Sequence, residues 1–224
     1  MATKVSEDIV GKAITDDEVM YGRCQKGSSF YEKLVNLSDN VPEISSVIFV
    51  SISSHGGESG NVLGSDGYGM TVSTMVELFQ SNENLLGILK VFTMQACKGG
   101  KTEMKFCGAD SADPREKGTD LATKAGGTLI AYSTSEGFVS WRDPGSGSWF
   151  LKILHDGVME PRYRNLHLVE ILTVCANLII QECEENESGT SFKETLSYLS
   201  TLTRFLRLHQ GEKGTKRCLN KNVN

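Results

Sequence analysis

Two apolar runs in this chain each end abruptly in small polar residues. The first, at 46–53, is followed by His55. The second, at 89–94, is followed by Gln95 and Cys97. Short apolar runs bounded by Gly and polar residues are typical of buried strands, and the carboxyl ends of such strands carry the ligand-binding groups of α/β sheets. The pattern therefore predicts two strands that deliver an imidazole and a thiol to the edge of a sheet.

The rest of the chain alternates between the periods of helices and strands. Residues 72–79 and 166–184 carry apolar stripes of helical period, and 127–133 is a third apolar run. Strands that alternate with helices predict an α/β fold. The other elements we expect are helical turns near 14–20 and 29–35, a small hairpin that begins near 61 and turns at Asp66-Gly67, a turn at 143–147, a helix that begins at 149, and a final strand at 201–209.

Composition excludes some classes of function but does not identify one. The 224 residues suffice for one domain or at most two, and 39% hydrophobic with 23% charged residues is ordinary for a globular protein. A net charge of −5 offers no general attraction to nucleic acid or to anionic membranes. The first residues lack the apolar segment of a signal peptide, and no apolar run is long enough to span a bilayer. We expect a protein of the cytosol or the nucleus.

The cysteines form no metal-binding or disulfide pattern. None of the six is part of a C-x-x-C pair, so we expect free thiols and no zinc site. Cys97 by itself is explained equally well as a small residue packed at the end of a strand. The six are Cys24, Cys97, Cys107, Cys175, Cys183 and Cys218.

The pairing of Cys97 with His55 gives the thiol a chemical role. A nucleophilic thiol needs a nearby imidazole, which favours the thiolate and protonates the leaving group. Adjacent parallel strands bring their carboxyl ends together, so the two residues can meet across the edge of the sheet. Glycine at Gly56 lets backbone N–H groups approach a substrate closely, and such donors can form an oxyanion hole. No third, orienting side chain is evident in the sequence.

Three motifs in order resemble the caspase family of cysteine endopeptidases. The segment 95–99, Gln-Ala-Cys-Lys-Gly, matches the family signature Q-A-C-[RQG]-G except at Lys98. His55 lies 42 positions upstream of Cys97 (97 − 55), close to the spacing of about 50 that the signature expects. The resemblance extends from about 47 to 209. Its other matching segments are 53–57 with 64–67, 131–134, and 139–150, the last of which reads VSWRDPGSGSWF.

The resemblance implies a fold and a set of catalytic roles. The fold would be a caspase-like three-layer sandwich, with a mostly parallel central sheet flanked by helices. Cys97 would be the nucleophile and His55 the acid and base. The N–H groups of Gly56 and Cys97 would hold the oxyanion. No cofactor and no metal are implied.

The resemblance also implies a pocket for a substrate aspartate. Gln95 and Arg142 would line this pocket, because a guanidinium binds a carboxylate through two hydrogen bonds. Ser140 and Trp141 would contact the substrate backbone and the neighbouring subsite, and Trp149 would lie near an outer subsite. From composition alone, both tryptophans are more often core or turn residues, so the roles given to them depend on the resemblance.

Caspases are made as zymogens that are cut at aspartates between a large and a small subunit. Residues 98–124 have no periodicity and predict a long loop. Asp110 and Asp120 are the candidate processing sites there, whereas Pro114 makes Asp113 a poor one. An exposed loop without processing remains the alternative. The resulting division is a poorly assigned segment 1–45, a large-subunit-like part 46–110, a linker 111–124, a small-subunit-like part 125–210 and a basic tail 211–224.

Two functions stay open at this point. One is an Asp-directed thiol protease of apoptosis or related signalling, which acts on protein substrates. The other is a weak or inactive regulator that binds an active caspase, through the strand predicted at 201–209, which lies at the dimer interface in the family. The intact pair of His55 and Cys97 favours the protease. The lack of a match in 1–45 to the family's first core strand and its second pocket arginine favours the regulator, and predicts an N-terminally abbreviated member.

Overall fold

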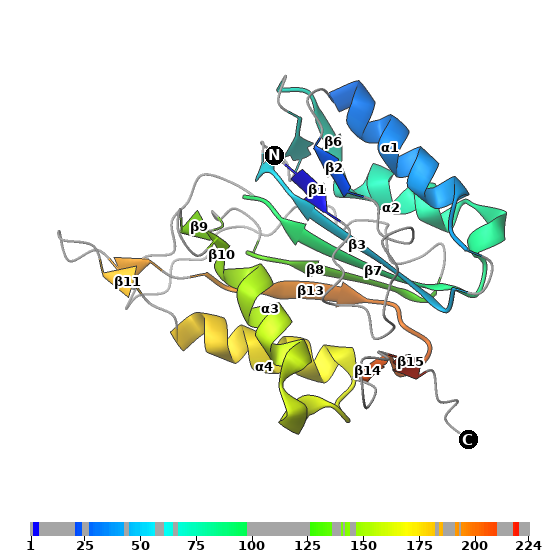
Figure 1. The fold of residues 1–224 in the computed structure, drawn as a ribbon. Coiled ribbons are helices and arrows are strands. Elements are labelled where there is room, and N and C mark those ends of the chain that lie inside the picture. Colours follow the sequence, from blue (N-terminus) through cyan, green and yellow to red (C-terminus); the bar gives the residue numbers. More distant parts are fainter. Residues whose placement is uncertain are drawn as a thin grey trace, which may run out of the picture.

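The structure, a computed structural model, arranges the chain around one central sheet with helices on both sides (Figure 1). The sheet has the order β13-β8-β7-β3-β1-β2. Its strands are β1 (Ala2–Lys4), β2 (Tyr21–Arg23), β3 (Val47–Ser53), β7 (Leu89–Gln95), β8 (Thr128–Tyr132) and β13 (Ser197–Ser200). The structure describes residues 2–4, 21–23, 27–42, 45–56, 61–64, 67–97, 126–135, 140, 142–143, 147–181, 184–185, 191–192, 194–209 and 217–219.

The three middle strands of the sheet run parallel. β3 pairs with β7 in register from Val47 opposite Leu89 to Ser53 opposite Gln95. β7 pairs in turn with β8, and β13 and β1 run antiparallel to their neighbours β8 and β3. All seven residues of β7 are buried. A strand that is covered on both faces has to be apolar along most of its length, which is why its sequence shows no alternation.

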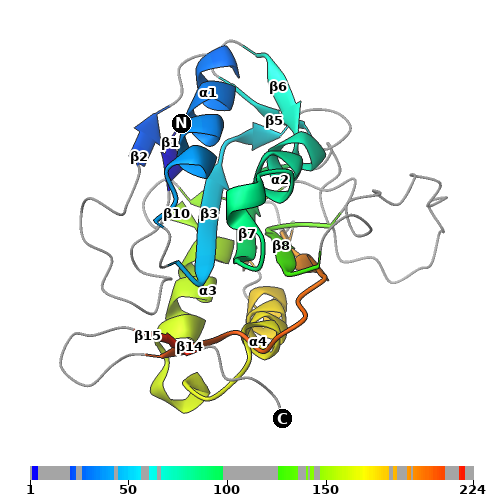
Figure 2. The ribbon, with the colours of Figure 1, turned by 90° about the vertical axis from the view of Figure 1, so that its right-hand side faces the viewer.

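Two helices cover each face of the sheet, which gives three layers (Figure 2). α1 (Gly27–Asp39) and α2 (Val72–Gln80) pack on one face, where the rings of Phe79 and Phe92 meet edge to face with centroids 5.4 Å apart. α3 (Trp149–Met159) and α4 (Leu168–Gln181) pack on the other face against residues such as Phe49 and Leu129. The architecture is the three-layer α/β sandwich that the sequence predicted.

Short elements connect these layers. β4 (His55–Gly56), β5 (Asn61–Leu63) and β6 (Gly69–Thr71) form a small antiparallel sheet just after β3. Single 3-10 turns occur at Glu83–Leu85 and Pro161–Tyr163. The other short pairs are β9 (Arg142–Asp143) with β10 (Gly147–Ser148), β11 (Glu184–Glu185) with β12 (Ser191–Phe192), and β14 (Arg207–His209) with β15 (Arg217–Leu219).

A buried lysine fixes the turn that leads into β7. The Nζ of Lys90 donates to the carbonyl oxygens of Leu85 at 2.8 Å and Ile88 at 3.0 Å. Burial lowers the pKa of Lys90, because removal from water disfavours the charged form. These two bonds tie the start of the central strand to the chain that precedes it.

Most of the predicted elements are present. The predicted strands at 46–53, 89–94 and 127–133 correspond to β3, β7 and β8. The predicted helices correspond to α1 to α4, and α1 is longer than the two turns expected. The helix start at 14–20 and most of the loop 98–124 lie outside the residues that the structure describes.

The predicted final strand at 201–209 is wrong in its position. The strand that pairs with β8 is β13, at 197–200, and 201–206 have no strand structure. Only 207–209 of the predicted span form a strand, and its partner β15 lies in the predicted basic tail at 211–224. The alternation in 201–209 reflects Leu206 and Leu208, which are buried in the core beneath α4 without joining the sheet.

Two further observations concern the surface. Among the described helices, none combines the length and the apolar character that a membrane crossing needs.

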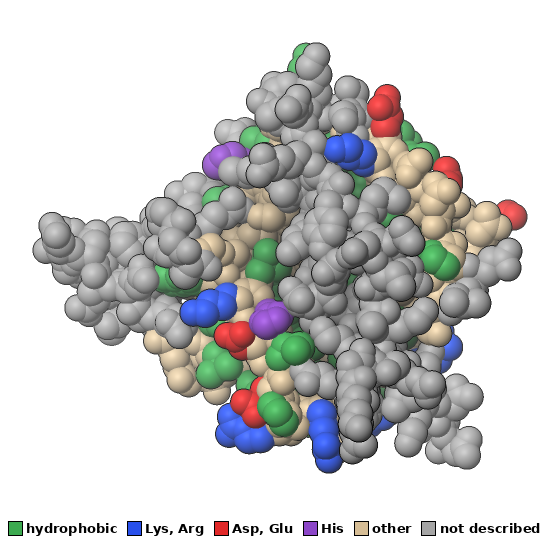
Figure 3. Space-filling view, in the orientation of Figure 1, with side chains coloured by type: hydrophobic (Ala, Val, Ile, Leu, Met, Phe, Trp, Pro, Cys, Tyr) green, Lys and Arg blue, Asp and Glu red, His purple; other side chains and the backbone are tan. Residues whose placement is uncertain are grey.

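On the face seen in Figure 3, the described residues include both acidic and basic side chains, and in the lower part of the view the two kinds lie next to one another.

The contact between α3 and α4 depends on Gly157. A Cβ at this position would lie 2.8 Å from the Sγ of Cys175 and 3.4 Å from a methyl group of Ile171. We expect Gly157→Ala to lower the free energy of unfolding by about 1–2 kcal/mol, because overpacking outweighs the gain in helix propensity. Urea denaturation measures this loss, and Cys175→Ala in the same background should recover part of it. A Gly157→Ala protein as stable as the parent would contradict the packing described here.

Candidate active site

The ends of β3 and β7 are joined directly by a hydrogen bond. The backbone N–H of Ser54 donates to the carbonyl oxygen of Gln95 at 3.0 Å. The Ser54 hydroxyl donates in turn to the carbonyl oxygen of Leu63 in the neighbouring small sheet. His55 follows at once as the first residue of β4, with an exposed side chain. The chain is thus fixed by Ser54 before the residue that presents the imidazole, and by the pairing of Gly56 with Val62 after it.

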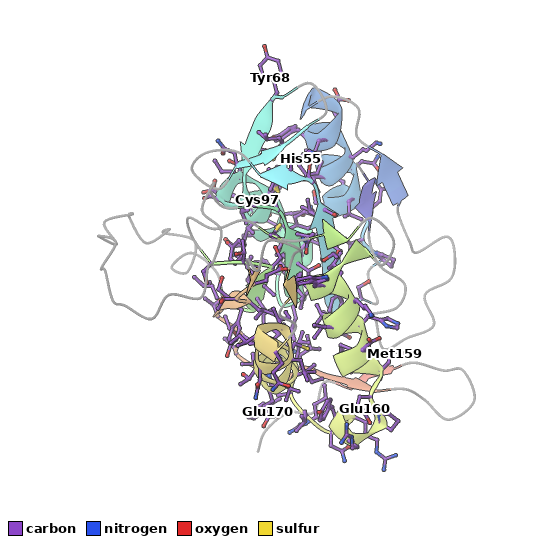
Figure 4. The ribbon with its side chains drawn as sticks, turned by 90° about the vertical axis from the view of Figure 1, so that its left-hand side faces the viewer. His55, Tyr68, Cys97, Met159, Glu160 and Glu170 are labelled. Carbon is purple, nitrogen blue, oxygen red and sulfur yellow. The ribbon has the colours of Figure 1, made fainter. Side chains whose placement is uncertain are left out.

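Gly56 lies against the backbone of Cys97. A Cβ on Gly56 would overlap the carbonyl oxygen of Cys97 and lie 2.8 Å from its nitrogen, so no other residue fits. This close approach brings the segment that carries His55 into contact with the segment that carries the thiol. Figure 4 shows His55 and Cys97 together at this edge of the sheet. The meeting of the two strand ends that the sequence predicted is present.

The sulfur of Cys97 is held by a backbone donor from a distant segment. The N–H of Ser140 donates to Sγ at 3.4 Å, and Sγ lies 3.8 Å from the carbonyl oxygen of Ser140. Cys97 is half-buried, so the thiol is partly accessible. The backbone of Ser140 therefore fixes the position of the sulfur through both its N–H and its carbonyl oxygen.

Gln95 is the centre of a buried polar network. Its Nε2 donates to the Ser140 hydroxyl, and its Oε1 accepts from the Ser148 hydroxyl. Ser148 is the N-cap of α3 and also accepts from the N–H of Leu151 at 3.1 Å. The Ser140 hydroxyl donates to Glu194 at 3.0 Å. The side chain of Gln95 is therefore fixed between α3 and the segment that holds the sulfur.

The remaining predicted site residues are placed only in part. Arg142 lies in β9 opposite Ser148, which puts its backbone next to the bonding partner of Gln95. Trp149 is the first residue of α3 and is half-buried. The side chain of Arg142 and the whole of Trp141, Asp110 and Asp120 lie outside the described part of the chain.

Cys175 shows what a packing cysteine looks like in this fold. It lies in α4 with no exposed surface, and its Sγ donates to the carbonyl oxygen of Ile153 at 3.5 Å. Burial, followed by the charge of Asp156, raises the pKa of Cys175 to about 12. A thiol in this environment stays protonated and unreactive, in contrast to the half-buried Cys97.

Glu194 is the site residue that sequence reasoning missed. It has no exposed surface and lies three residues before β13. In the sequence it follows an acidic, loop-like stretch and reads as an ordinary surface carboxylate. Its partner Ser140 is 54 positions away, so no local pattern could have revealed the contact.

The assembled groups suit acyl transfer through a covalent intermediate. A partly accessible thiol, a neighbouring imidazole-bearing segment and backbone donors lie at one edge of the sheet. Within the described residues, no cluster of His, Cys, Asp and Glu is arranged to hold a metal ion.

Comparisons with known proteins show the family of the chain. The sequence model of the caspase domain matches residues 17–206, and the chain belongs to the caspase family. It is 32% identical over 181 residues to caspase-3 of Xenopus laevis, a match that covers 80% of this chain and 62% of that protein. It is 32% identical over 150 residues to caspase-7 of Gallus gallus, which covers 62% of this chain and 46% of that protein. The chain thus matches less than two thirds of the length of these curated relatives.

A solved structure supports the fold. The crystal structure of caspase-1 from Spodoptera frugiperda superposes with a TM-score of 0.63 over 80% of this chain and 69% of that chain, at 21% sequence identity. The predicted caspase-like sandwich with helices on both faces is confirmed.

The contrast between the two cysteines can be tested by alkylation. We expect iodoacetamide to modify Cys97 in the folded protein and to leave Cys175 unmodified, because burial and the raised pKa keep the Cys175 thiol protonated. Peptide mapping by mass spectrometry reports each site separately, and both should react in denaturant. Modification of Cys175 at the rate of Cys97 in the folded state would contradict the assignment.

Proposed function

We propose that this chain is a cysteine endopeptidase that cleaves protein substrates after aspartate. The observation that carries the proposal is the contact between Gly56 and Cys97, which places the imidazole-bearing segment beside the thiol. Membership of the caspase family supports the same chemistry. The proposed setting is apoptosis or related proteolytic signalling, in the cytosol or the nucleus.

The proposed reaction has two stages. The Cys97 thiolate attacks the carbonyl carbon of the scissile peptide, a C–S bond forms, and the carbonyl oxygen takes the negative charge. The N–H groups of Gly56 and Cys97 hold that oxygen. His55 protonates the leaving amine as the C–N bond breaks, which leaves a thioester. His55 then takes a proton from water, which attacks the thioester and releases the acid and the free thiol.

Selectivity for aspartate is assigned to Gln95 and Arg142. The amide of Gln95 is fixed by Ser148 and Ser140, so it is pre-oriented for a ligand. The backbone pairing of Arg142 with Ser148 keeps the guanidinium-bearing residue within the same group. Asp110 and Asp120 remain the predicted processing sites, and 111–124 the predicted linker.

Association with a second caspase chain is part of the proposal, but the proposed contact surface differs from the strand predicted at 201–209. The predicted contact strand at 201–209 is not the edge of the sheet. In the described part of the chain, the sheet ends at β2 on one side and at β13 on the other, and β13, which pairs with β8 alone, is the edge strand that directly precedes 201–209. An edge strand presents unpaired backbone groups to a partner strand, so we place the proposed dimer contact at 197–200. A regulator of an active caspase would use the same edge.

A direct test compares fluorogenic peptides with Asp or Asn at the cleavage position. We expect turnover with Asp, and a loss of about 10-fold or more in kcat/KM with Asn, because a charge-assisted contact to the carboxylate is lost. Cys97→Ala should abolish turnover, and Cys175→Ala serves as the matched control.

Turnover that is independent of Cys97, or none at all from a folded sample, would contradict the peptidase proposal. In that case the protein is mixed with an active caspase. A changed rate together with a mixed dimer would support the regulator, and failure of both would exclude it.

A further inference from the structure

A continuous chain of hydrogen bonds runs from the start of α3 to Glu194. The Ser148 hydroxyl donates to Gln95, Gln95 donates to the Ser140 hydroxyl, and that hydroxyl donates to Oε1 of Glu194 at 3.0 Å. Each link donates in the same direction, so each polarises the next. The chain requires an acceptor at its far end, and Glu194 supplies it.

The chain that directly follows Glu194 is fixed by two hydrogen bonds. The Ser135 hydroxyl donates to the carbonyl oxygen of Thr195 at 3.3 Å, and the Ser197 hydroxyl donates to that of Thr134 at 3.2 Å. These bonds join the segment before β13 to the segment after β8, and the pairing of Ser197 with Tyr132 continues the connection. A carboxylate on such a support is a rigid anchor.

Ser140 is the point where this anchor reaches the thiol. Its hydroxyl is bound to Gln95 and Glu194, while its backbone N–H donates to the Sγ of Cys97 at 3.4 Å. A shift of Ser140 would therefore move the donor away from the sulfur. It would also release the amide of Gln95, because both are tied to the same hydroxyl.

We propose that Glu194 is a positioning residue for the Cys97 site, which holds Ser140 so that its N–H stays on the sulfur and its hydroxyl stays on Gln95. The role depends on the acceptor oxygen of Glu194. An apolar side chain there would leave a buried hydroxyl without its acceptor, at a cost that a shift of Ser140 would relieve. The effect on Cys97 stands without peptidase activity, whereas the effect on substrate cleavage rests on the proposed function.

The test compares Glu194→Leu with Glu194→Gln. Leu removes the acceptor, and Gln keeps an acceptor oxygen at nearly the same place. The readout is the rate of Cys97 alkylation by iodoacetamide at fixed pH, followed by peptide mapping. We expect Glu194→Leu to slow alkylation by about fivefold or more, and Glu194→Gln to stay within about twofold of the parent. Exposed Glu83→Leu is the control, and thermal unfolding establishes that each variant is folded.

A second pair of variants keeps the test decisive if Glu194→Leu does not fold. Ser140→Ala removes the hydroxyl and keeps the backbone N–H, so it should slow alkylation as well. Adding Glu194→Leu to Ser140→Ala should then change nothing further, because the link is already broken and no hydroxyl is left without its acceptor. An unchanged alkylation rate in folded Glu194→Leu or in Ser140→Ala, or an equal loss in Glu194→Leu and Glu194→Gln, would overturn the proposal. These outcomes do not depend on whether any peptide is cleaved.

Discussion

The in-register pairing of β3 with β7 is the constraint on which the site depends. It sets Ser53 opposite Gln95, after which the N–H of Ser54 reaches the Gln95 carbonyl and Gly56 meets Cys97. A slip of one residue would turn every side chain of a strand to the other face of the sheet. Gln95 would then point away from α3 and lose Ser148. The register is held by apolar side chains that are buried on both faces of β7, so the packing of the core fixes the geometry of the chemistry.

The polar part of the site is built by segments that are far apart in the sequence. β7 supplies Gln95, and the N-cap of α3 supplies Ser148. Ser140 lies in the segment after β8, and Glu194 lies in the segment before β13. In a buried environment each of these groups is costly without a partner, so the network stabilises one arrangement of all four. That arrangement also holds the sulfur through Ser140. The same hydrogen bonds that stabilise this edge of the sheet therefore also position the Cys97 sulfur.

The sequence predicted the parts of the fold that depend on local pattern. β3, β7 and β8 were found because continuous apolar runs are typical of strands covered on both faces, and α2 and α4 because their stripes have a helical period. β13 was missed because an edge strand of half-exposed residues has no continuous apolar run. The alternation that includes the buried Leu206 and Leu208 predicted a strand further along the chain instead. His55 and Cys97 are predicted from their positions after strands and from the family motifs. Glu194 and Lys90 were not, because burial of a charged residue is set by partners that the local sequence does not reveal.

The central claim is that Cys97 is a nucleophile served by His55 and by a pocket for aspartate. The most direct measurement is mass spectrometry of the protein after reaction with a peptidyl-aspartyl fluoromethyl ketone, which alkylates the nucleophile of a cysteine protease. The account predicts one adduct, at Cys97, that forms far more slowly in His55→Ala and with a ketone that carries asparagine in place of aspartate. A folded protein that gains no adduct at Cys97, or that reacts equally well without His55, would contradict it.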